Sequence, residues 1–251
     1  MRETIVLIHG SANGSYSWGP VQRALEAAGA KVVAPDMLGY GSAPEPSAGW
    51  TIDQEVSHLE EALDGLEAIH LVAHSLGVMF ALYLLRRLGA RVVRLTLIDP
   101  VLVSLLRETG EGDGFAEMEG IYQRFMGLFP DHAPAARAFV EHWNGAGSWE
   151  RIGDKARAII TRLISKVRLE VMAARADTTK LADIVRTRPP TIILLGERTR
   201  IAPRAVARRL GEVFEAQTVI IPGAGHMIPL THPEAVAREV LEFQSNQKKG
   251  G

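Results

Sequence analysis

Unbroken runs of apolar, often β-branched residues recur along the chain, separated by segments with helical spacing. The runs are mostly continuous rather than alternating, as expected for parallel strands that are covered by helices on both faces. They predict six strands, at residues 4–10, 31–36, 68–74, 91–99, 191–197 and 217–223. Helical patterns lie between them, near residues 18–28, 52–66, 76–89, 203–215 and 233–245.

This regular alternation predicts an α/β fold, with a doubly wound, mostly parallel sheet of about six strands and helices on both faces. Signals for helix starts agree with it. Pro20, Pro203 and Pro233 suit positions in the first turn of a helix, and "TIDQ" at residues 51–54 has the form of a capping box.

One connection breaks the rhythm, because about ninety residues between Asp99 and Thr191 contain no convincing strand. Helical patterns occupy residues 115–129, 133–146 and 148–175. A structureless loop of that length would be unusual, so we expect an inserted helical cap over the carboxyl ends of the strands, where open α/β sheets bind ligands. The expected division is a core of residues 1–100 and 188–251 and a cap of residues 101–187.

Composition narrows the functional classes. The 251 residues include 28 Lys and Arg against 29 Asp and Glu, a net charge of -1, which gives no reason to expect a nucleic acid or an anionic membrane as partner. There is no cysteine, so disulfides and thiolate chemistry are excluded and a reducing compartment is permitted. The chain enters a strand-like run by residue 4 and its apolar runs are too short to span a bilayer. We expect a cytoplasmic protein, a monomer or homodimer.

A candidate nucleophile lies in "VAHSLG", residues 72–77, between a buried-type strand and a helix. Ser75 is flanked two positions away by Ala73 and Gly77, which gives the pattern small-x-Ser-x-Gly of a nucleophile elbow. The tight turn needs small neighbours for close packing of the strand and the helix, so alanine in place of the usual first glycine should be tolerated.

Partners for this serine follow other strands at the same edge of the sheet. His226 lies in the loop after the last strand, in "PGAGHMIPLTHPEAV", and is the candidate general base. The loop "HGSANGSYSW" follows the first strand, so the backbone N–H of Ser11 can converge with that of Leu76 to form an oxyanion hole. His74, next to the serine, is expected to be structural. No spacing typical of metal ligands is present, and we expect no metal and no cofactor.

Five segments carry a resemblance to a known family: "LIHGSANGSYSW", "APDMLGYGSA", "LVAHSLG", "LTLIDP" and "IPGAGHM". Their order and spacing resemble those of the α/β-hydrolase superfamily, over residues 4–99 and 190–245. The resemblance implies a Ser-acid-His triad and a cap domain. The chain lacks two leading strands found in many members, and in this it is similar to the compact esterases, methylesterases and hydroxynitrile lyases. Haloalkane dehalogenases and epoxide hydrolases of this fold need a carboxylate where this chain has Ser75.

The triad acid is the open point of this resemblance. Many members carry an aspartate in a pattern like G-x-x-D-x-x-x-P, but here the segment is "GERTRIAP", with Thr199 at the expected position. Asp99 ends the strand after the nucleophile helix, where some members place their acid, and is the favoured candidate. Glu197 is the second candidate, and a Ser-His dyad without an acid is the third.

Large apolar residues near the predicted site and in the cap suggest an apolar substrate pocket. The candidate substrate contacts are Trp18, Phe125, Trp143, Asn144 and Met227. The favoured function is hydrolysis of a small or medium carboxylic ester, thioester or lactone through an acyl-enzyme on Ser75. C–C bond hydrolysis or hydroxynitrile lyase chemistry on the same triad is an alternative. A ligand-binding or receptor protein on a hydrolase scaffold is an alternative of another class.

Overall fold

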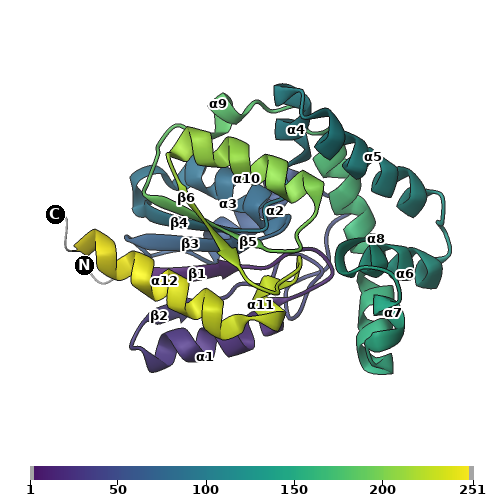
Figure 1. The fold of residues 1–251 in the computed structure, drawn as a ribbon, viewed down its shortest axis with the longest axis horizontal. Helices are drawn as coiled ribbons and strands as arrows, with labels where there is room; N and C mark the ends of the chain where they lie inside the picture. Colours follow the sequence, from purple (N-terminus) through teal and green to yellow (C-terminus); the bar gives the residue numbers. More distant parts are fainter. Residues whose placement is uncertain (1–2, 249–251) are drawn as a thin grey trace.

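Six parallel strands form one sheet in the computed structural model, which describes residues 3–248 (Figure 1). In spatial order the strands are β2-β1-β3-β4-β5-β6. Their bounds are β1 (Thr4–Ile8), β2 (Lys31–Val33), β3 (Ile69–His74), β4 (Val92–Ile98), β5 (Thr191–Gly196) and β6 (Gln217–Ile221). The order reverses direction between β1 and β3, and such a switch point opens a crevice at the carboxyl ends of its two strands. The loops that carry Ser11 and Ser75 begin there.

Helices cover both faces of the sheet, as the sequence predicts (Figure 1). One face carries α1 (Gly19–Ala27) and α12 (Pro233–Lys248). The other carries α2 (Ile52–Glu61), α3 (Gly77–Leu88) and α10 (Ile201–Phe214). The expected capping box is present, because the Thr51 side chain accepts from the Gln54 N–H and the Gln54 side chain accepts from the Thr51 N–H. Short helical turns complete the core: η1 (Ser15–Trp18), η2 (Gly89–Arg91) and α11 (Ile228–Thr231).

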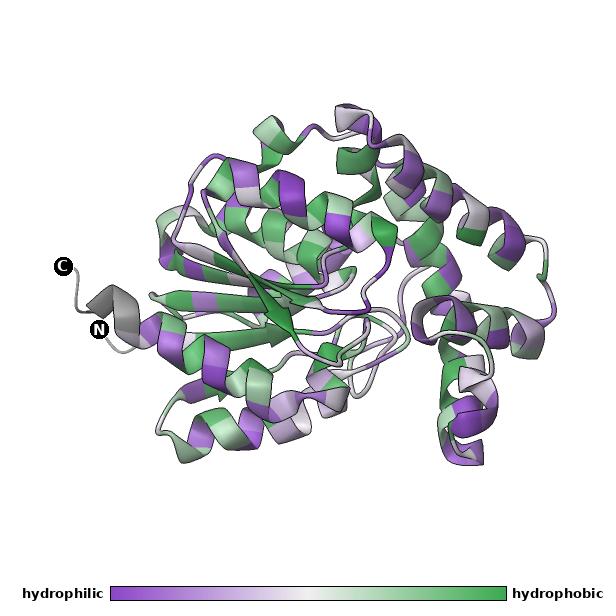
Figure 2. Cartoon of the chain, in the orientation of Figure 1, coloured by the Kyte–Doolittle hydropathy of each residue, from purple (hydrophilic) through white to green (hydrophobic). Residues whose placement is uncertain are grey.

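Three strands, β1, β3 and β5, are buried along their whole length, which explains why their sequences are mostly unbroken apolar runs. Every residue of β1, β3 and β5 is buried. Figure 2 shows the strands mostly hydrophobic, while the covering helices carry hydrophobic residues on one stripe and polar residues on the other. Five of the six predicted strands are one to three residues too long at their carboxyl ends, where the chain leaves the sheet, whereas β3 ends at His74 as predicted.

Between β4 and β5 the chain forms only helices, as expected for the insertion. They are α4 (Val103–Thr109), α5 (Gly112–Met126), α6 (His132–Asn144), α7 (Ser148–Arg151), α8 (Asp154–Ala176) and α9 (Leu181–Ile184). Apolar residues of α4 and α9 join the main core cluster, whereas α5, α6 and α8 share a separate small cluster that includes Phe125 and Val167. The helices α5 to α8 therefore form the cap itself, on the right in Figure 1.

No helix among residues 3–248 combines the length and the apolar character needed to cross a bilayer. Within the same residues, no group of three or more acidic or histidine side chains is arranged to hold a metal ion.

Gly77, the first residue of α3, lies unusually close to the end of β1. A Cβ atom added there would lie 2.4 Å from the backbone oxygen of His9 and 2.9 Å from that of Ile8. We expect Gly77→Ala to lower the free energy of unfolding by about 1–3 kcal/mol, because backbone atoms must shift to relieve the overlap. Urea unfolding followed by circular dichroism measures this effect.

Gly120→Ala is the matched control for that experiment. Gly120 lies within α5, and a Cβ atom there would meet no atom within 4 Å. Since glycine weakens a helix interior by about 0.5–1 kcal/mol relative to alanine, this substitution should stabilise the protein. If both substitutions shifted the free energy of unfolding alike, the close approach at Gly77 would not be the cause.

Candidate active site

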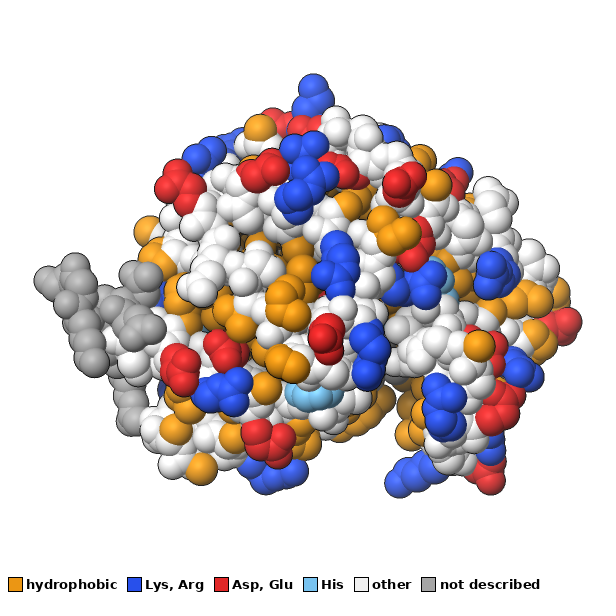
Figure 3. Space-filling model, in the orientation of Figure 1, with side chains coloured by type: hydrophobic (Ala, Val, Ile, Leu, Met, Phe, Trp, Pro, Cys, Tyr) orange, Lys and Arg blue, Asp and Glu red, His pale blue; other side chains and the backbone are white. Residues whose placement is uncertain are grey.

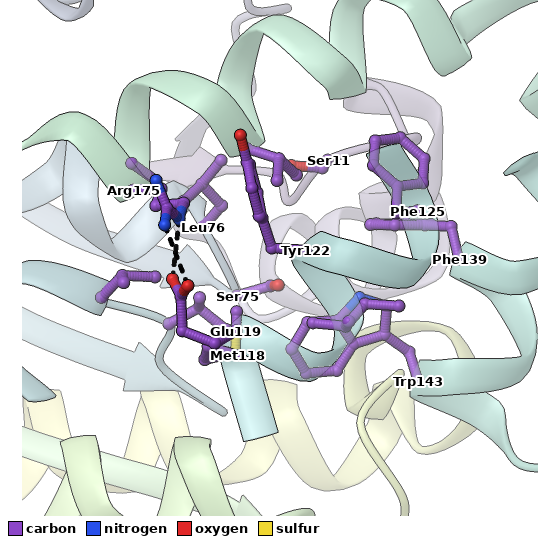
Figure 4. A pocket seen from close by; sticks show the side chains of 15 residues that line it. Ser11, Ser75, Leu76, Met118, Glu119, Tyr122, Phe125, Phe139, Trp143 and Arg175 are labelled. Atoms are coloured by element: carbon purple, nitrogen blue, oxygen red, sulfur yellow. Dashed lines mark hydrogen bonds and ion pairs between the residues drawn. The ribbon is translucent and has the colours of Figure 1, made fainter. Parts of the chain in front are cut away.

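Ser75 occupies a strained turn between β3 and α3. Its φ of +56° lies in the left-handed region, which is unfavourable for residues other than glycine. Three backbone hydrogen bonds hold the turn: the Ser75 N–H donates to Ile98 O at 2.9 Å, and the N–H groups of Val78 and Val101 donate to Ser75 O. Ser75 is nearly buried, and its Oγ points into a cavity (Figure 4). These are the features of a nucleophile elbow.

His226 connects this serine to a carboxylate. Its Nε2 lies 2.9 Å from the Oγ of Ser75, and its Nδ1 lies 2.5 Å from an oxygen of Asp99. An ionised carboxylate only accepts hydrogen bonds, so the Nδ1 carries the hydrogen and the Nε2 is free to accept from the Ser75 hydroxyl. All three side chains are buried. The structure therefore brings together the three residues that the sequence singled out.

Asp99 is fully buried at the end of β4, also with a positive φ, of +45°. Its second oxygen accepts hydrogen bonds from the Thr199 hydroxyl and, at 3.4 Å, from the Gly196 N–H. Thr199, at the position where the sequence resemblance led us to expect an aspartate, thus donates a hydrogen bond to the oxygen of Asp99 that does not contact His226. Glu197 is exposed and accepts from the Gly223 N–H at 2.8 Å, so it caps a turn and does not contact His226.

His74 fixes the loop that carries His226. Its Nε2 donates to the backbone oxygen of His226 at 2.8 Å, across 152 residues of chain. Burial, with a smaller contribution from the charge of neighbouring His226, lowers the pKa of His74 to about 3. It is therefore neutral at pH 7, with one N–H to donate. The expectation of a structural histidine at this position agrees with these contacts.

Two of the backbone amides near Ser75 that have no acceptor among residues 3–248 are the predicted oxyanion donors. They belong to Ser11, in the loop after β1, and to Leu76, at the start of α3. Both residues line the same cavity as Ser75. Unpaired amides near a nucleophile can stabilise the negative charge that develops on a carbonyl oxygen.

A buried polar network, which no sequence pattern indicated, holds the loop of Ser11. The N–H of Ala12 donates to the hydroxyl of Tyr40 at 3.2 Å, and that hydroxyl donates to Glu170 of α8 at 2.8 Å. Lys166 lies between Glu170 and Glu55, 3.1 Å and 2.8 Å from their carboxylate oxygens. The network links the cap helix α8 to the residue beside the candidate oxyanion donor.

Removal of the Tyr40 hydroxyl should therefore slow catalysis without changing the substrate pocket. Tyr40 lines neither of the two cavities that meet at Ser75. We expect Tyr40→Phe to lower kcat by about 10-fold with little change in KM, because Ala12 loses the hydrogen bond that orients its loop. Steady-state kinetics with a p-nitrophenyl ester measures both constants.

Tyr83→Phe provides the matched control. The Tyr83 hydroxyl also joins the core to the helical insertion, with Asp177 and Thr179 as partners, but it lies outside both cavities. Its loss should leave kcat unchanged. A rise in KM alone for Tyr40→Phe would argue against the positioning of the oxyanion loop by this hydroxyl.

Two cavities meet at Ser75, and residues of the cap line both. The inner cavity, of about 50 Å³, is lined mainly by apolar side chains, among them Val101, Val103, Met118, Ile121, Phe125 and Val171 (Figure 4). The outer cavity, of about 420 Å³, is lined by His226, Asn144, Arg151, Ile159, Met227 and Leu230, among others. The indole of Trp143 lines both and stacks on His226, with ring centroids 4.1 Å apart.

Four of the five predicted substrate contacts lie in these walls: Phe125 in the inner cavity, Asn144 and Met227 in the outer one, and Trp143 in both. The interpretation of Trp18 was wrong. Its indole is fully buried in the core cluster between the sheet, α1 and α12, together with Val21 and Val236, and it lines neither cavity. Trp18 lies close in sequence to the loop after β1, but η1 directs its side chain into the core, and no sequence pattern indicates this.

Comparison with known proteins agrees with this arrangement. The family model described as the alpha/beta hydrolase family matches residues 5–239. A putative non-heme chloroperoxidase of Synechocystis sp. is 29% identical over 253 residues, which cover 96% of this chain and 91% of that protein. A 2-hydroxy-6-oxononadienedioate/2-hydroxy-6-oxononatrienedioate hydrolase of Cupriavidus pinatubonensis is 26% identical, over 97% of this chain and 87% of its own. The crystal structure of a bromoperoxidase from Bacillus anthracis has the same fold, with a TM-score of 0.77, 21% identity and coverage of 98% and 92%.

Proposed function

Because this chain belongs to the alpha/beta hydrolase family, we propose that it is a serine hydrolase that cleaves a carboxylic ester through an acyl-enzyme on Ser75. The observation that carries this proposal is the continuous hydrogen-bonded path from the Ser75 Oγ through His226 to Asp99, beside two amides without acceptors. In this proposal Ser75 is the nucleophile, His226 the general base and Asp99 the acid that orients it.

The first half of the proposed reaction forms the acyl-enzyme. Ser75 Oγ attacks the ester carbonyl carbon while its proton passes to the Nε2 of His226. The carbonyl oxygen takes the negative charge and accepts from the N–H groups of Ser11 and Leu76. When the tetrahedral intermediate collapses, the bond between carbon and the alcohol oxygen breaks, and His226 donates its proton to that oxygen.

The second half releases the acid. Water gives a proton to the Nε2 of His226 and adds to the acyl carbon, the bond to Ser75 Oγ breaks, and the proton returns to the serine. Asp99 remains ionised and stabilises the imidazolium in both halves. Its burial makes this electrostatic contribution larger than it would be in water, because the surrounding dielectric constant is low.

We also propose that the enzyme acts in the cytoplasm on a small molecule. A chain without cysteine suits a reducing compartment. Cavities of about 50 and 420 Å³ suit a substrate of small-molecule size rather than a polymer.

A second candidate function is cleavage of a carbon–carbon bond, favoured by the similarity to the dienedioate hydrolase. The name of that relative specifies a substrate with two carboxylates. In this chain the inner cavity is apolar and its one arginine, Arg175, is already paired with Glu119 (Figure 4). An ionised carboxylate in that cavity would lack a free partner, which favours an ester without a charged acyl group.

A fluorophosphonate probe and a set of p-nitrophenyl esters test the proposal. We expect stoichiometric labelling of Ser75, and a burst of p-nitrophenol equal to the enzyme concentration where deacylation is slower than acylation. Hydrolysis of a dienedioate without any ester turnover would favour the carbon–carbon reaction. Absence of both labelling and turnover would favour a binding protein on a hydrolase scaffold.

A further inference from the structure

The two cavities at Ser75 differ in which catalytic groups they expose. Ser11, Ser75, Phe139 and Trp143 line both of them. Leu76, whose amide is a proposed oxyanion donor, lines only the inner cavity, whereas His226 lines only the outer one. The scissile bond of a substrate must therefore lie across the junction, with one part of the molecule on each side of Trp143.

The position of His226 decides which part lies where. The proton on its Nε2 must reach the oxygen of the leaving alcohol, so this oxygen has to lie on the side of the imidazole. The alcohol then extends into the outer cavity. The acyl carbon stays on Ser75 with its oxygen directed at the amides, and the acyl chain continues into the inner cavity.

From this geometry we infer the substrate class: an ester of a short, apolar acid with a larger alcohol that is neutral or anionic. The inference rests on the proposed function. The inner cavity measures about 50 Å³. The outer cavity is far larger, about 420 Å³, so the smaller part of the substrate, its acyl chain, suits the inner one.

The charges of the two walls support the same class. The charged residues of the inner wall, Glu119 and Arg175, satisfy each other through two hydrogen bonds of 2.8 Å and 3.0 Å (Figure 4). The outer wall has Arg151 and no aspartate or glutamate, and no carboxylate among residues 3–248 pairs with this arginine. A cationic alcohol would find no compensating charge there, whereas an anionic one would.

The outer cavity also has room and an opening for a large alcohol. Its wall includes the exposed side chains of Tyr16 and Leu230, so the far end of the alcohol reaches solvent. Figure 3 shows the surface hollowed between the cap, at the lower right, and the core, with hydrophobic side chains along the hollow. The inner cavity is lined by buried Phe125, and also by the partly exposed pair Glu119 and Arg175 (Figure 4).

The decisive experiment measures kcat/KM for p-nitrophenyl esters of straight-chain acids with two to eight carbons. Each value is divided by the rate constant of alkaline hydrolysis of the same ester, which removes intrinsic reactivity. We expect a maximum between acetate and butyrate and a fall of at least 10-fold by octanoate. A second series of acetates with phenyl, naphthyl and larger alcohols should vary by less than 10-fold. The inference is overturned if octanoate is the best substrate, or if methyl esters of long acids outperform the acetates.

Two substitutions on the same cap helix, α8, separate the two cavities. Val171 lines the inner cavity and Ile159 the outer one, and both are partly buried. We expect Val171→Phe to lower kcat/KM for the butyrate at least 10-fold more than for the acetate. Ile159→Phe should keep the acyl-chain profile and instead reduce turnover of acetates with bulky alcohols. Val171→Ala enlarges the inner cavity and should move the maximum of kcat/KM to longer acids. This variant tests the same wall if Val171→Phe does not fold.

Charge selectivity is tested with two phenyl acetates that carry opposite charges at the same ring position, 3-acetoxybenzoate and 3-(trimethylammonio)phenyl acetate. The anionic ester should be preferred several-fold at low ionic strength, less at high salt, and not in Arg151→Gln. Equal preference at all salt concentrations would remove the anionic alcohol from the inferred class.

Titration of active serines with a small fluorophosphonate shows whether a failure concerns the substrate class or the serine hydrolase activity itself. Full labelling combined with a flat acyl-chain profile would overturn the substrate class and leave the serine hydrolase intact. Loss of both labelling and ester turnover would overturn the proposed function itself.

Discussion

Ser75→Ala is expected to lower kcat for p-nitrophenyl acetate by about 10⁶-fold, the largest effect of any single substitution in this chain. The only heavy atom removed is the Oγ, 2.9 Å from the Nε2 of His226. Without it no acyl-enzyme can form, and the remaining acceleration comes from the Ser11 and Leu76 amides acting on direct attack by water. Stopped-flow measurement of the p-nitrophenol burst and of the steady-state rate would quantify the loss.

Ser104→Ala is the matched control for this prediction. Ser104 is also a buried serine, in α4, but it lines neither cavity. Its alanine variant should retain the burst, the steady-state rate and fluorophosphonate labelling. If Ser75→Ala kept more than a tenth of the wild-type turnover while its thermal unfolding was unchanged, a nucleophile other than Ser75 would have to be sought.

Much of the fold was predictable because a strand that is buried on both faces has a continuous apolar sequence. Residues of β1 and β3 are all buried, so their sequences are mostly apolar without alternation. The helices between them carry apolar residues along one face only. The ends of the strands were less predictable. The strand predicted at residues 31–36 stops at Val33, because Pro35 has no N–H for the sheet and Asp36 accepts hydrogen bonds from the N–H groups of Ser15 and Ser42 in neighbouring loops.

The residues of the candidate site were predictable where a position at a strand end coincided with a reactive side chain. Ser75, Asp99 and His226 all follow strands of one parallel sheet, whose carboxyl ends meet at one edge. The hydrogen bonds that hold the loops of these three residues in place were not predictable. Tyr40 and Glu170 lie 130 residues apart, and His74 and His226 lie 152 apart, so no local pattern could pair them.

Asp99→Asn is expected to lower kcat by about 10⁴-fold while the fold and KM change little. The surroundings of Asp99 give the reason. The Thr199 hydroxyl and the Gly196 N–H both donate to one oxygen of the carboxylate, so an asparagine must keep its own oxygen at that place. Its NH₂ group then faces the Nδ1 of His226, which has to accept. The hydrogen of the imidazole moves to the Nε2, and this nitrogen can no longer take the proton of Ser75.

The Glu197→Gln variant and fluorophosphonate labelling make this prediction specific to Asp99. Glu197 caps the turn at Gly223, and its glutamine can still accept from that N–H, so kcat should stay within about twofold of the wild type. Ser75 should also react at least 10³-fold more slowly with a fluorophosphonate in Asp99→Asn, because that reaction needs the same proton transfer without any ester chemistry. Should Asp99→Asn label and turn over at the wild-type rate while Glu197→Gln fails in both assays, the acid would be Glu197. The close hydrogen bond between Asp99 and His226 would then serve only to hold the loop.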